Sequence, residues 1–283
     1  MRPPWQHLLF NFSFLLCPMY SPLQLAFKYL NYYLSASNRK GHNIHSPFVF
    51  EFITKILNDK TVYAAYNDVE ELRRQLVRNK SILSIDDFGA GSAVSKTNQR
   101  TIASIAKNAA KSKKFGQLLY RMVKFYQPQT ILELGTSLGI TTSYLAKANT
   151  GSKVITMEGA KEIIAVAKEN FNHLRVQNVE IAEGDFSKTL PTAIGQLSTV
   201  NLAFIDGNHR LRPTIQYFET ILAKTNNFSI LVLDDIHWSK EMEQAWKYCK
   251  DHSSVTLSID LFFIGILIFR KEIKEKQHFS IRF

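Results

Sequence analysis

Short apolar runs alternate with amphipathic stretches along residues 115–270, and this alternation predicts strands and helices in turn. Runs of strand length and composition occupy residues 130–134, 153–157, 179–182, 200–205 and 229–233. Apolar side chains recur at helical spacing in residues 115–126, 141–147, 161–174 and 213–222, and again at Met242, Ala245, Trp246 and Cys249. Residues 255–260 and 263–270 predict a final antiparallel pair. The expected fold is therefore α/β, a doubly wound, mostly parallel sheet of seven strands.

Residues 1–114 lack this alternation and predict a mainly helical, basic extension. Pro47 opens a segment in which Phe48, Phe52 and Ile56 recur at helical spacing, and residues 70–77 predict another short helix. Residues 81–92 combine a strand-like run with a G-x-G, as a nucleotide loop does. A basic stretch, 96–114, follows them instead of a second strand ending in an acid, so we interpret them as a linking turn. Residues 115–283 are then expected to form a separate domain.

The start of the chain is apolar but predicts no membrane span. The apolar stretch 8–16 is interrupted by Pro18, whereas a bilayer-spanning helix needs about 20 residues. No small-residue cleavage site is evident, and large leucines precede Cys17 where a lipoprotein signal has small residues. The stretch is either an amphipathic helix packed on the domain or a misassigned start. We favour the second, with Met19 as the initiator and residues 1–18 not translated.

Most of the net positive charge of the chain lies in the extension. The chain has a formal net charge of +11; residues 1–114 hold 16 Lys and Arg against 7 Asp and Glu, and the remainder holds 19 against 17. Such an imbalance keeps RNA among the candidate partners, although scattered lysines more often form a solvated face. Cys17 and Cys249 have neither disulfide nor metal-site spacing, which favours a reducing compartment, and the cytoplasm is the expected location.

Residues 130–139, T-I-L-E-L-G-T-S-L-G, predict a strand, a glycine-rich turn and the start of a helix. Such a unit binds a nucleoside-bearing cofactor at the carboxyl edge of a doubly wound sheet. A phosphate-binding loop would need a lysine after the last glycine, and none follows Gly139. A dinucleotide loop would need a glycine where Ser137 stands. The carboxylate of Glu133, two residues before Gly135, suits a cationic ligand better.

This loop resembles motif I of the class I S-adenosylmethionine-dependent methyltransferases, whose cofactor carries an ammonium and a sulfonium but no phosphate. The next strand ends in Glu158, at about the spacing of 20 residues where an acid receives ribose hydroxyls. The third strand ends at Asp185 and Phe186, where the family contacts adenine. The resemblance implies a Rossmann-like methyltransferase fold. It also implies a cofactor site made by Gln117, Glu133, Gly135, Thr136, Ser137, Gly139, Glu158, Gly159, Asp185, Phe186 and Asp206.

Three further segments resemble the catechol-type and bacterial O-methyltransferases. Residues 116–119 match the G-Q-x-L that precedes motif I, while F-I-D-G-N-H (204–209) and L-D-D-I-H-W (233–238) are similar to the F-I-D-x-x-K and D-N-x-x-x-W segments. The resemblance puts Asp206, Asp234 and Asp235 where the family holds a divalent ion such as Mg²⁺. It departs at Asp235, where the family has Asn, and at His209, where it has a Lys that serves as base.

Two interpretations of this acidic group remain open. In the first, a metal-bound substrate hydroxyl loses its proton to His209 or to Asp206 and its oxygen attacks the sulfonium methyl group. In the second no metal binds: Asp206 contacts only the methionine part of the cofactor, Asp234 and Asp235 cap the next helix, and the histidines line a pocket. His237 and Trp238 are candidates for the substrate wall. His42 and His45 are expected to have capping or packing roles rather than to be ligands.

The sequence lacks motifs typical of other methyltransferase classes, and this restricts the reactions that the chain is expected to catalyse. The end of the fourth strand reads D-G-N-H rather than the Asn- or Asp-Pro-Pro-aromatic of amino methyltransferases, and Cys249 lies in a core-facing stripe, unlike the nucleophile of a cytosine methyltransferase. O-methylation of a small molecule is the leading hypothesis. The alternatives are an RNA methyltransferase that uses the basic extension, an adaptor that binds S-adenosylmethionine without catalysis, and a nicotinamide oxidoreductase. The sequence leaves the oligomeric state open.

Overall fold

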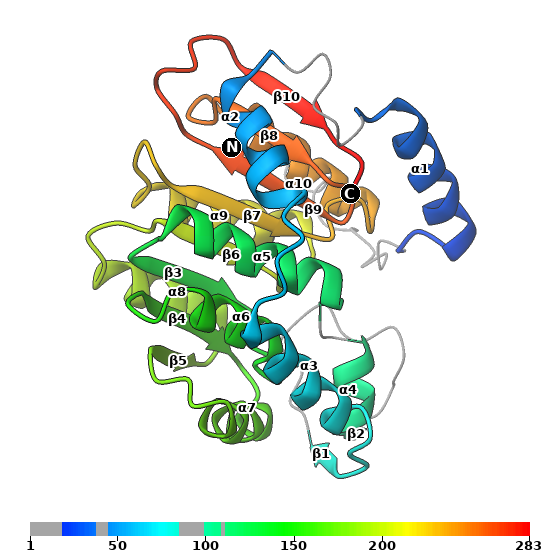
Figure 1. Ribbon diagram of the computed structural model, residues 1–283, viewed down its shortest axis with the longest axis vertical. Helices are drawn as coiled ribbons and strands as arrows, with labels where there is room; N and C mark the ends of the chain where they lie inside the picture. Colours follow the sequence, from blue (N-terminus) through cyan, green and yellow to red (C-terminus); the bar gives the residue numbers. More distant parts are fainter. Residues whose placement is uncertain (1–18, 38–44, 85–98, 109–110) are drawn as a thin grey trace, which may run out of the picture.

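The structure, a computed structural model, describes residues 19–37, 45–84, 99–108 and 111–283. Its centre is an eight-stranded sheet in the order β10-β8-β9-β7-β6-β3-β4-β5 (Figure 1). Five strands are parallel to their neighbours within this group: β3 (Thr130–Leu134), β4 (Lys153–Glu158), β5 (Val179–Glu183), β6 (Leu202–Ile205) and β7 (Ile230–Asp234). The chain enters at β3, proceeds outward to β5, and returns on the other side of β3 as β6. The order reverses between β3 and β6, which is where open α/β sheets bind ligands.

The remaining strands complete one side of the sheet. β9 (Ile264–Ile268) is antiparallel to both β7 and β8 (Leu257–Asp260), as predicted. All seven predicted strands are present. β10 (Gln277–Ser280) adds an eighth, parallel to β8, in a tail for which no strand was predicted. The sequence of β10 is short and polar, with every residue at least partly exposed, so it carries little strand signal of its own.

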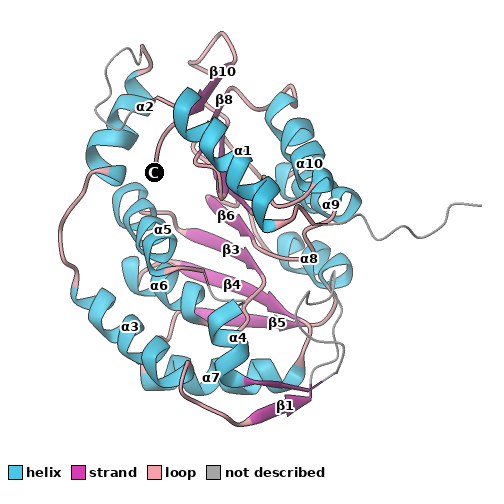
Figure 2. Ribbon diagram, turned by 90° about the vertical axis from the view of Figure 1, so that its right-hand side faces the viewer, coloured by secondary structure: helices cyan, strands magenta, loops and turns pink. Residues whose placement is uncertain are grey.

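Helices cover both faces of the sheet (Figure 2). One face packs against α5 (Lys113–Tyr126), α6 (Ile140–Ala148) and α7 (Lys161–His173), and the other against α8 (Phe186–Gly195), α9 (Leu211–Leu222) and α10 (Lys240–Asp251). The sheet therefore has a hydrophobic core on each face, and successive residues of a strand pack into opposite cores. Ile131 lies in the first core, beneath α5, α6 and α7, and Leu132 lies in the second. Because both faces are buried, the strands are continuously apolar rather than alternating.

The extension shares the first of these cores. It consists of α2 (Pro47–Glu51), the π-helix η1 (Phe52–Leu57), α3 (Ala64–Leu76), a hairpin of β1 (Ile82–Ser84) and β2 (Gln99–Thr101), and α4 (Ile102–Asn108). η1 packs on α5 and α3 packs on α6, so residues such as Phe52 and Val69 are buried in the same cluster as Ile131. Only the strand-like part of the predicted linking turn, 81–92, is described, and it forms β1. Its G-x-G lies outside the described residues.

The wide turn of η1 is stabilised by an arginine from the neighbouring helix. The Asn58 N–H donates to the Ile53 carbonyl, five residues earlier, and the Arg121 Nε donates to the Ile56 carbonyl at 2.7 Å. A carbonyl that would otherwise lose its partner at the helix end is thereby satisfied.

The helix α1 (Pro22–Ser35) docks beside the end of the sheet formed by β8 and β9. Tyr29 and Tyr32 pack on Phe262, and the Lys28 Nζ lies 2.9 Å from the Glu243 carboxylate of α10. Just after α1, the Ser37 N–H donates to the carbonyl of Ser280 in β10 at 2.8 Å. The opposite face of α1 is apolar and open, with side chains that include Leu23, Phe27 and Leu34. Throughout the described ranges, no helix combines the length and apolar character needed to cross a bilayer.

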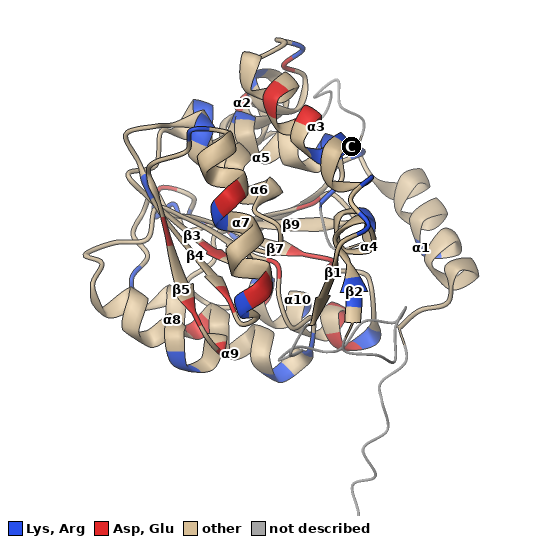
Figure 3. Ribbon diagram, turned by 90° about the horizontal axis from the view of Figure 1, so that it is seen from below, with Lys and Arg blue, Asp and Glu red and all other residues tan. Residues whose placement is uncertain are grey.

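Some of the basic side chains along or beside α3 are paired with acids. The ion pairs Arg73–Glu70 (3.1 Å), Arg74–Glu71 (2.6 Å) and Lys147–Asp68 (3.0 Å) lie along or beside α3. Figure 3 marks basic and acidic positions along the ribbon, and both kinds occur in this view.

Candidate functional site

The carboxyl ends of β3, β4 and β6 are joined by their backbones. The Gly135 N–H donates to the Met157 carbonyl at 3.0 Å, and the Asp206 N–H donates to the Leu134 carbonyl at 2.9 Å. Gly135 has φ +106°, and a Cβ at this position would stand 2.1 Å from the carbonyl oxygen of Asp206. Only glycine permits this approach, so the motif I loop and the loop after β6 form one continuous edge.

Glu158, at the end of β4, fixes the motif I loop. Its carboxylate accepts backbone hydrogen bonds from Ser137 (3.0 Å), Gly159 (2.8 Å) and Ala160 (3.1 Å). The residue remains partly exposed, so its oxygens retain lone pairs on the accessible side of the edge. This arrangement fits an acceptor for ribose hydroxyl groups.

The loop between β3 and α6 presents polar groups without partners. Ser137 takes a left-handed conformation (φ 47°), and its buried hydroxyl has no hydrogen-bond partner among the described residues. Gly139 (φ 77°) precedes α6 as its N-cap, and the helix begins without a side-chain cap. A free hydroxyl beside an uncapped helix N-terminus suits a negatively charged group such as the carboxylate of an amino acid. The side chain of Thr136, in contrast, is buried and bonded to Thr156.

Glu133, which is predicted to contact a cationic ligand, has a buried side chain whose Oε1 has no hydrogen-bond partner among the described residues. Its side chain is fully buried and accepts hydrogen bonds from the hydroxyls of Thr142 and Thr156. Burial raises the pKa of Glu133 to about 8, although the two threonine hydroxyls act to lower it. Glu133 therefore supports the loop from below, between α6 and β4.

This geometry predicts a pH-dependent stability that Glu133→Gln should remove. Because the folded-state pKa is raised, the folded chain holds a proton that the unfolded chain has released, and stability falls as pH rises from the ordinary carboxyl range through about 8. We expect Glu133→Gln to melt at a higher temperature than the parent at about pH 9 and to lose part of the decline between about pH 5 and pH 9. Cofactor affinity should change little. A large loss of affinity would instead indicate direct contact with the ligand.

Two other predicted cofactor residues have different surroundings from those expected. Gln117 lines a cavity of about 460 Å³ whose walls come from residues 59–74 and 113–121, and no residue of the motif I loop lines it. Asp185 caps α8 by accepting from the Ser187 N–H at 2.7 Å. Phe186 lies against Gly207, so it borders the loop that follows Asp206.

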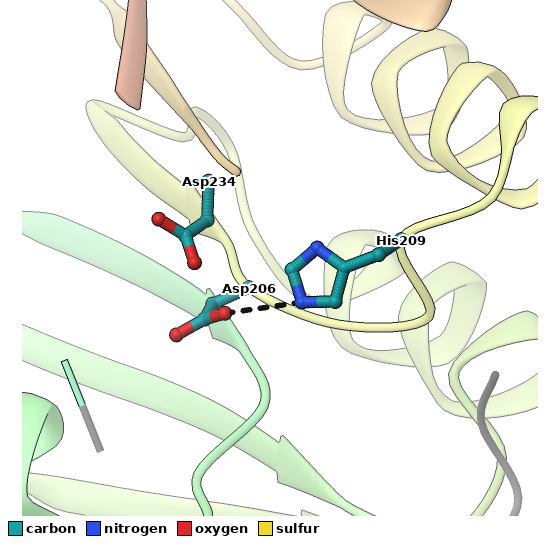
Figure 4. Close-up of side chains that lie close together, drawn as sticks. All are labelled: Asp206, His209 and Asp234. Carbon is teal, nitrogen blue, oxygen red and sulfur yellow. Dashed lines mark ion pairs between the residues drawn. The ribbon is translucent and has the colours of Figure 1, made fainter. Parts of the chain in front are cut away.

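Asp206, His209 and Asp234 converge at the same edge (Figure 4). One ligand atom from each lies within 4.8 Å of the others. The Nε2 of His209 is 3.4 Å from the Oδ1 of Asp206, and its ring meets Trp238 edge to face at 5.5 Å between centroids. Asn208 and His209 both have positive φ, a conformation that non-glycine residues adopt mainly where the surroundings impose it. The cluster is therefore held in place by its loop.

Asp235 differs from the predicted ligand set, because it does not belong to this group of three. Its backbone has φ 51° and its N–H donates to the Phe263 carbonyl at 2.7 Å. The Oδ1 of Asp235 lies 3.3 Å from the Nζ of Lys111 instead. Of the three predicted metal ligands, Asp206 and Asp234 are brought together, and His209 takes the third position.

Lys111 is the functional residue that sequence reasoning missed. Its side chain is only 12% exposed and forms an ion pair with the fully buried carboxylate of Asp234 in addition to its contact with Asp235. Burial alone would lower the pKa of Lys111, but the charges of Asp234, Asp206 and Asp235 raise it. Lys111 is thus a charged ammonium within the acidic cluster. The sequence signal was diluted because this lysine is one of several in the stretch 96–114.

Burial and the charges within the cluster also shift the pKa values of its carboxylates. Burial would raise the pKa of Asp206, but Lys111 and His209 outweigh it and lower that pKa to about 2. Burial and the two neighbouring carboxylates raise the pKa of Asp234 well above its ordinary range. Neighbouring titratable groups with opposed shifts are typical of functional sites.

The two residues predicted to form the substrate wall, His237 and Trp238, have different surroundings. The ring of Trp238 lies beside that of His209. Both ring nitrogens of His237 are bound by carboxylates, Asp260 at 2.8 Å and Glu243 at 3.1 Å, and the ring stacks on Phe262. His237 thus ties β8 to α10. His45 is exposed just before α2, and His42 lies outside the described residues.

Comparisons with known proteins agree with this geometry. Residues 132–236 match a family described as a methyltransferase domain. A catechol O-methyltransferase of Mycobacterium tuberculosis is 27% identical over 158 residues, which are 55% of this chain and 68% of that protein. A catechol O-methyltransferase of Niastella koreensis is 27% identical over 124 residues, 43% of this chain and 55% of its own length. A methyltransferase of Podospora anserina, solved with S-adenosylhomocysteine, has the same fold at a TM-score of 0.57, with 15% identity over 80% of this chain and 97% of that one.

The sheet order and the glycine loop at its switch point, together with the match of residues 132–236 to a methyltransferase domain, are similar to those of the class I S-adenosylmethionine-dependent methyltransferases. Within that class, the chain is similar to the O-methyltransferases of the catechol type.

Proposed function

We propose that this enzyme transfers a methyl group from S-adenosylmethionine to a hydroxyl oxygen of a small molecule. The observation that carries the proposal is the convergence of two sets of groups at one sheet edge. The Glu158-bound loop after β3 and the Asp206, His209 and Asp234 cluster are joined through the contact of Gly135 with Asp206. A cofactor held by the first set would present its methyl group to an acceptor held by the second.

We assign the cofactor contacts as follows. Glu158 accepts the ribose hydroxyls, and the free hydroxyl of Ser137 with the N-terminus of α6 receives the carboxylate of the methionine part. Asp206 attracts the ammonium group, since its depressed pKa keeps its carboxylate charged. Asp185 and Phe186 lie at the end of β5, where the adenine would be held. S-adenosylmethionine supplies an electrophilic methyl group on a sulfonium centre.

The acceptor must lose a proton as its oxygen attacks the methyl carbon and the carbon–sulfur bond breaks. His209, which lies between Asp206 and Trp238, is the base in this proposal. Asp206 orients the imidazole and stabilises the imidazolium that forms. Trp238 supplies a flat apolar wall suited to an aromatic acceptor. The products are a methyl ether, S-adenosylhomocysteine and the proton on His209.

The two carboxylates and the imidazole of this cluster also fit a divalent cation, because one ligand atom from each lies within 4.8 Å of the others. In the described part of the chain, the buried oxygens of Asp234 have no hydrogen-bond donor besides the Lys111 ion pair. Asp206, Asp234 and His209 would hold such an ion. When bound, it would lower the pKa of an acceptor hydroxyl. If His209 is a ligand it cannot at the same time be the base, so the two roles are alternatives.

A transfer assay tests the proposal. The purified chain would be incubated with methyl-labelled S-adenosylmethionine and, separately, with catechol and with the small-molecule, RNA and protein fractions of a cell extract. Label in catechol or in the small-molecule fraction is the expected result. Label confined to RNA would overturn the proposal in favour of a nucleic acid acceptor. Cofactor binding without label in any fraction would identify an adaptor, and preferential binding of NADH would overturn the class of cofactor.

The cellular setting is part of the same proposal. Cys249 is a buried free thiol, which is consistent with a reducing compartment such as the cytoplasm.

A further inference from the structure

The most unusual feature of the site is a largely buried lysine, Lys111, that lies within a cluster of side chains suited to binding a cation. We propose that Lys111 is a built-in cation of the acidic cluster, which a divalent metal ion must displace before it can bind Asp234. The inference rests on the proposed function, since it concerns the same site. It also makes a separate statement about metal binding that does not depend on methyl transfer.

The geometry indicates that Lys111 and a divalent metal ion compete for the Asp234 carboxylate and do not bind it together. The Nζ of Lys111 contacts the carboxylate of Asp234 and lies 3.3 Å from that of Asp235. Asp234 has no exposed surface, and its charged neighbours among the described residues include Lys111, Asp206 and Asp235. A metal bound by Asp234 would place two positive charges beside an ammonium whose side chain is only 12% exposed. Repulsion between cations at such distances is strong where water is excluded.

Lys111 and Asp235 belong together in this interpretation. Asp235 adds a carboxylate where the resembled family has a neutral Asn, and Lys111 contacts that added carboxylate. The Asp235 side chain is only 28% exposed, so its carboxylate is partly desolvated, and the lysine supplies a charged partner for it. The departure at Asp235 is therefore explained by the presence of Lys111, and the pair changes the charge of the site without leaving either group alone.

Lys111 also connects two parts of the chain. It lies two residues before α5, at the boundary between the extension and the sheet, whereas Asp234 ends β7 and Asp235 follows it. A metal or an acceptor that draws Asp234 into its own coordination would release the Lys111 side chain from the end of β7. The extension is thereby linked to the occupancy of the site.

Direct titration with Mn²⁺ tests the proposal on the full chain. Binding would be measured by the electron paramagnetic resonance signal of free Mn²⁺, without acceptor, for the parent, for Lys111→Gln and for Lys113→Gln. Lys113 is exposed two residues away, so it controls for a general loss of positive charge. We expect Lys111→Gln to bind Mn²⁺ at least about tenfold more tightly than the parent, and Lys113→Gln to bind within about twofold of it. Adding Asp234→Asn to Lys111→Gln should remove the gain.

Equal Mn²⁺ affinity of the parent and Lys111→Gln would overturn the proposal, and so would a gain that survives Asp234→Asn. Thermal stabilisation by S-adenosylmethionine is measured on each protein in parallel. If all of them bind the cofactor but Mn²⁺ affinity does not change, the inference about Lys111 fails while the proposed function stands. If none binds the cofactor, the proposed function fails, and the Mn²⁺ titration still reports on Lys111.

Discussion

Replacing Gly135 with alanine is expected to reduce the affinity for S-adenosylmethionine by at least about 100-fold. The new Cβ would stand 2.1 Å from the carbonyl oxygen of Asp206, a distance that no real contact reaches, and φ +106° is unfavourable for any side chain. Strain of this kind costs about 1–3 kcal/mol before the overlap is counted. The loop and the end of β6 must separate, so the two halves of the site lose their alignment. Isothermal titration calorimetry with the cofactor measures the effect.

Gly195 provides the matched control, because a Cβ at that position meets nothing within 4 Å. Gly195→Ala should bind the cofactor as the parent does. Circular dichroism on both variants separates a local loss of binding from a failure to fold. If Gly135→Ala retained an affinity within about threefold of the parent, the close approach of the two loops would not be needed for the site.

Asp206→Asn is expected to lower kcat by about 10²- to 10⁴-fold with a smaller effect on cofactor affinity. Asparagine keeps the shape of the side chain but removes the charge that faces both His209 and Lys111. His209 would then lack the carboxylate that stabilises its protonated form during transfer. Steady-state kinetics with labelled cofactor and catechol, or the small-molecule fraction that takes label, gives kcat, and calorimetry gives the dissociation constant.

Asp68→Asn is a suitable control, since Asp68 is half exposed and its ion-pair partner among the described residues is Lys147 of α6. Its kcat should match that of the parent. Full activity of Asp206→Asn would remove Asp206 from the catalytic machinery. A loss of cofactor binding as large as the loss of kcat would restrict Asp206 to a binding role.

The arrangement of the sheet was predictable because it depends on patterns within single segments. Continuous apolar runs specify buried parallel strands, and the spacing from Gly135 to Glu158 follows from the length of one helix and one strand. Asp206 and Asp234 could be predicted to lie close together for the same reason, since the carboxyl ends of neighbouring parallel strands share an edge. The tail 271–283 was not recognised as containing a strand, because β10 is defined by its pairing with β8 rather than by its own residues.

Side-chain direction could not be predicted in the same way. Asp235 follows Asp234 immediately, but its left-handed backbone turns the carboxylate toward Lys111. Glu133 lies within a strand whose alternation points it at α6, so it is buried beneath the loop that it was expected to serve. Lys111 reaches the cluster from a segment more than a hundred residues earlier, a contact that only the packing of the extension on the sheet creates. Such contacts between distant segments leave no periodic signal in the sequence.

The docking of α1 has a consequence for how the protein is made in the cell. Lys28 and Glu243 are separated by 215 residues, and Tyr32 and Ile281 by 249. At about 5–20 residues per second, α1 leaves the ribosome on the order of ten seconds or more before its partners exist. Its tyrosines and leucines are uncovered during that interval and open to chaperones or to other nascent chains. Variants that delay the formation of β8, β9 and β10 should therefore lose yield through aggregation before they lose stability in the finished fold.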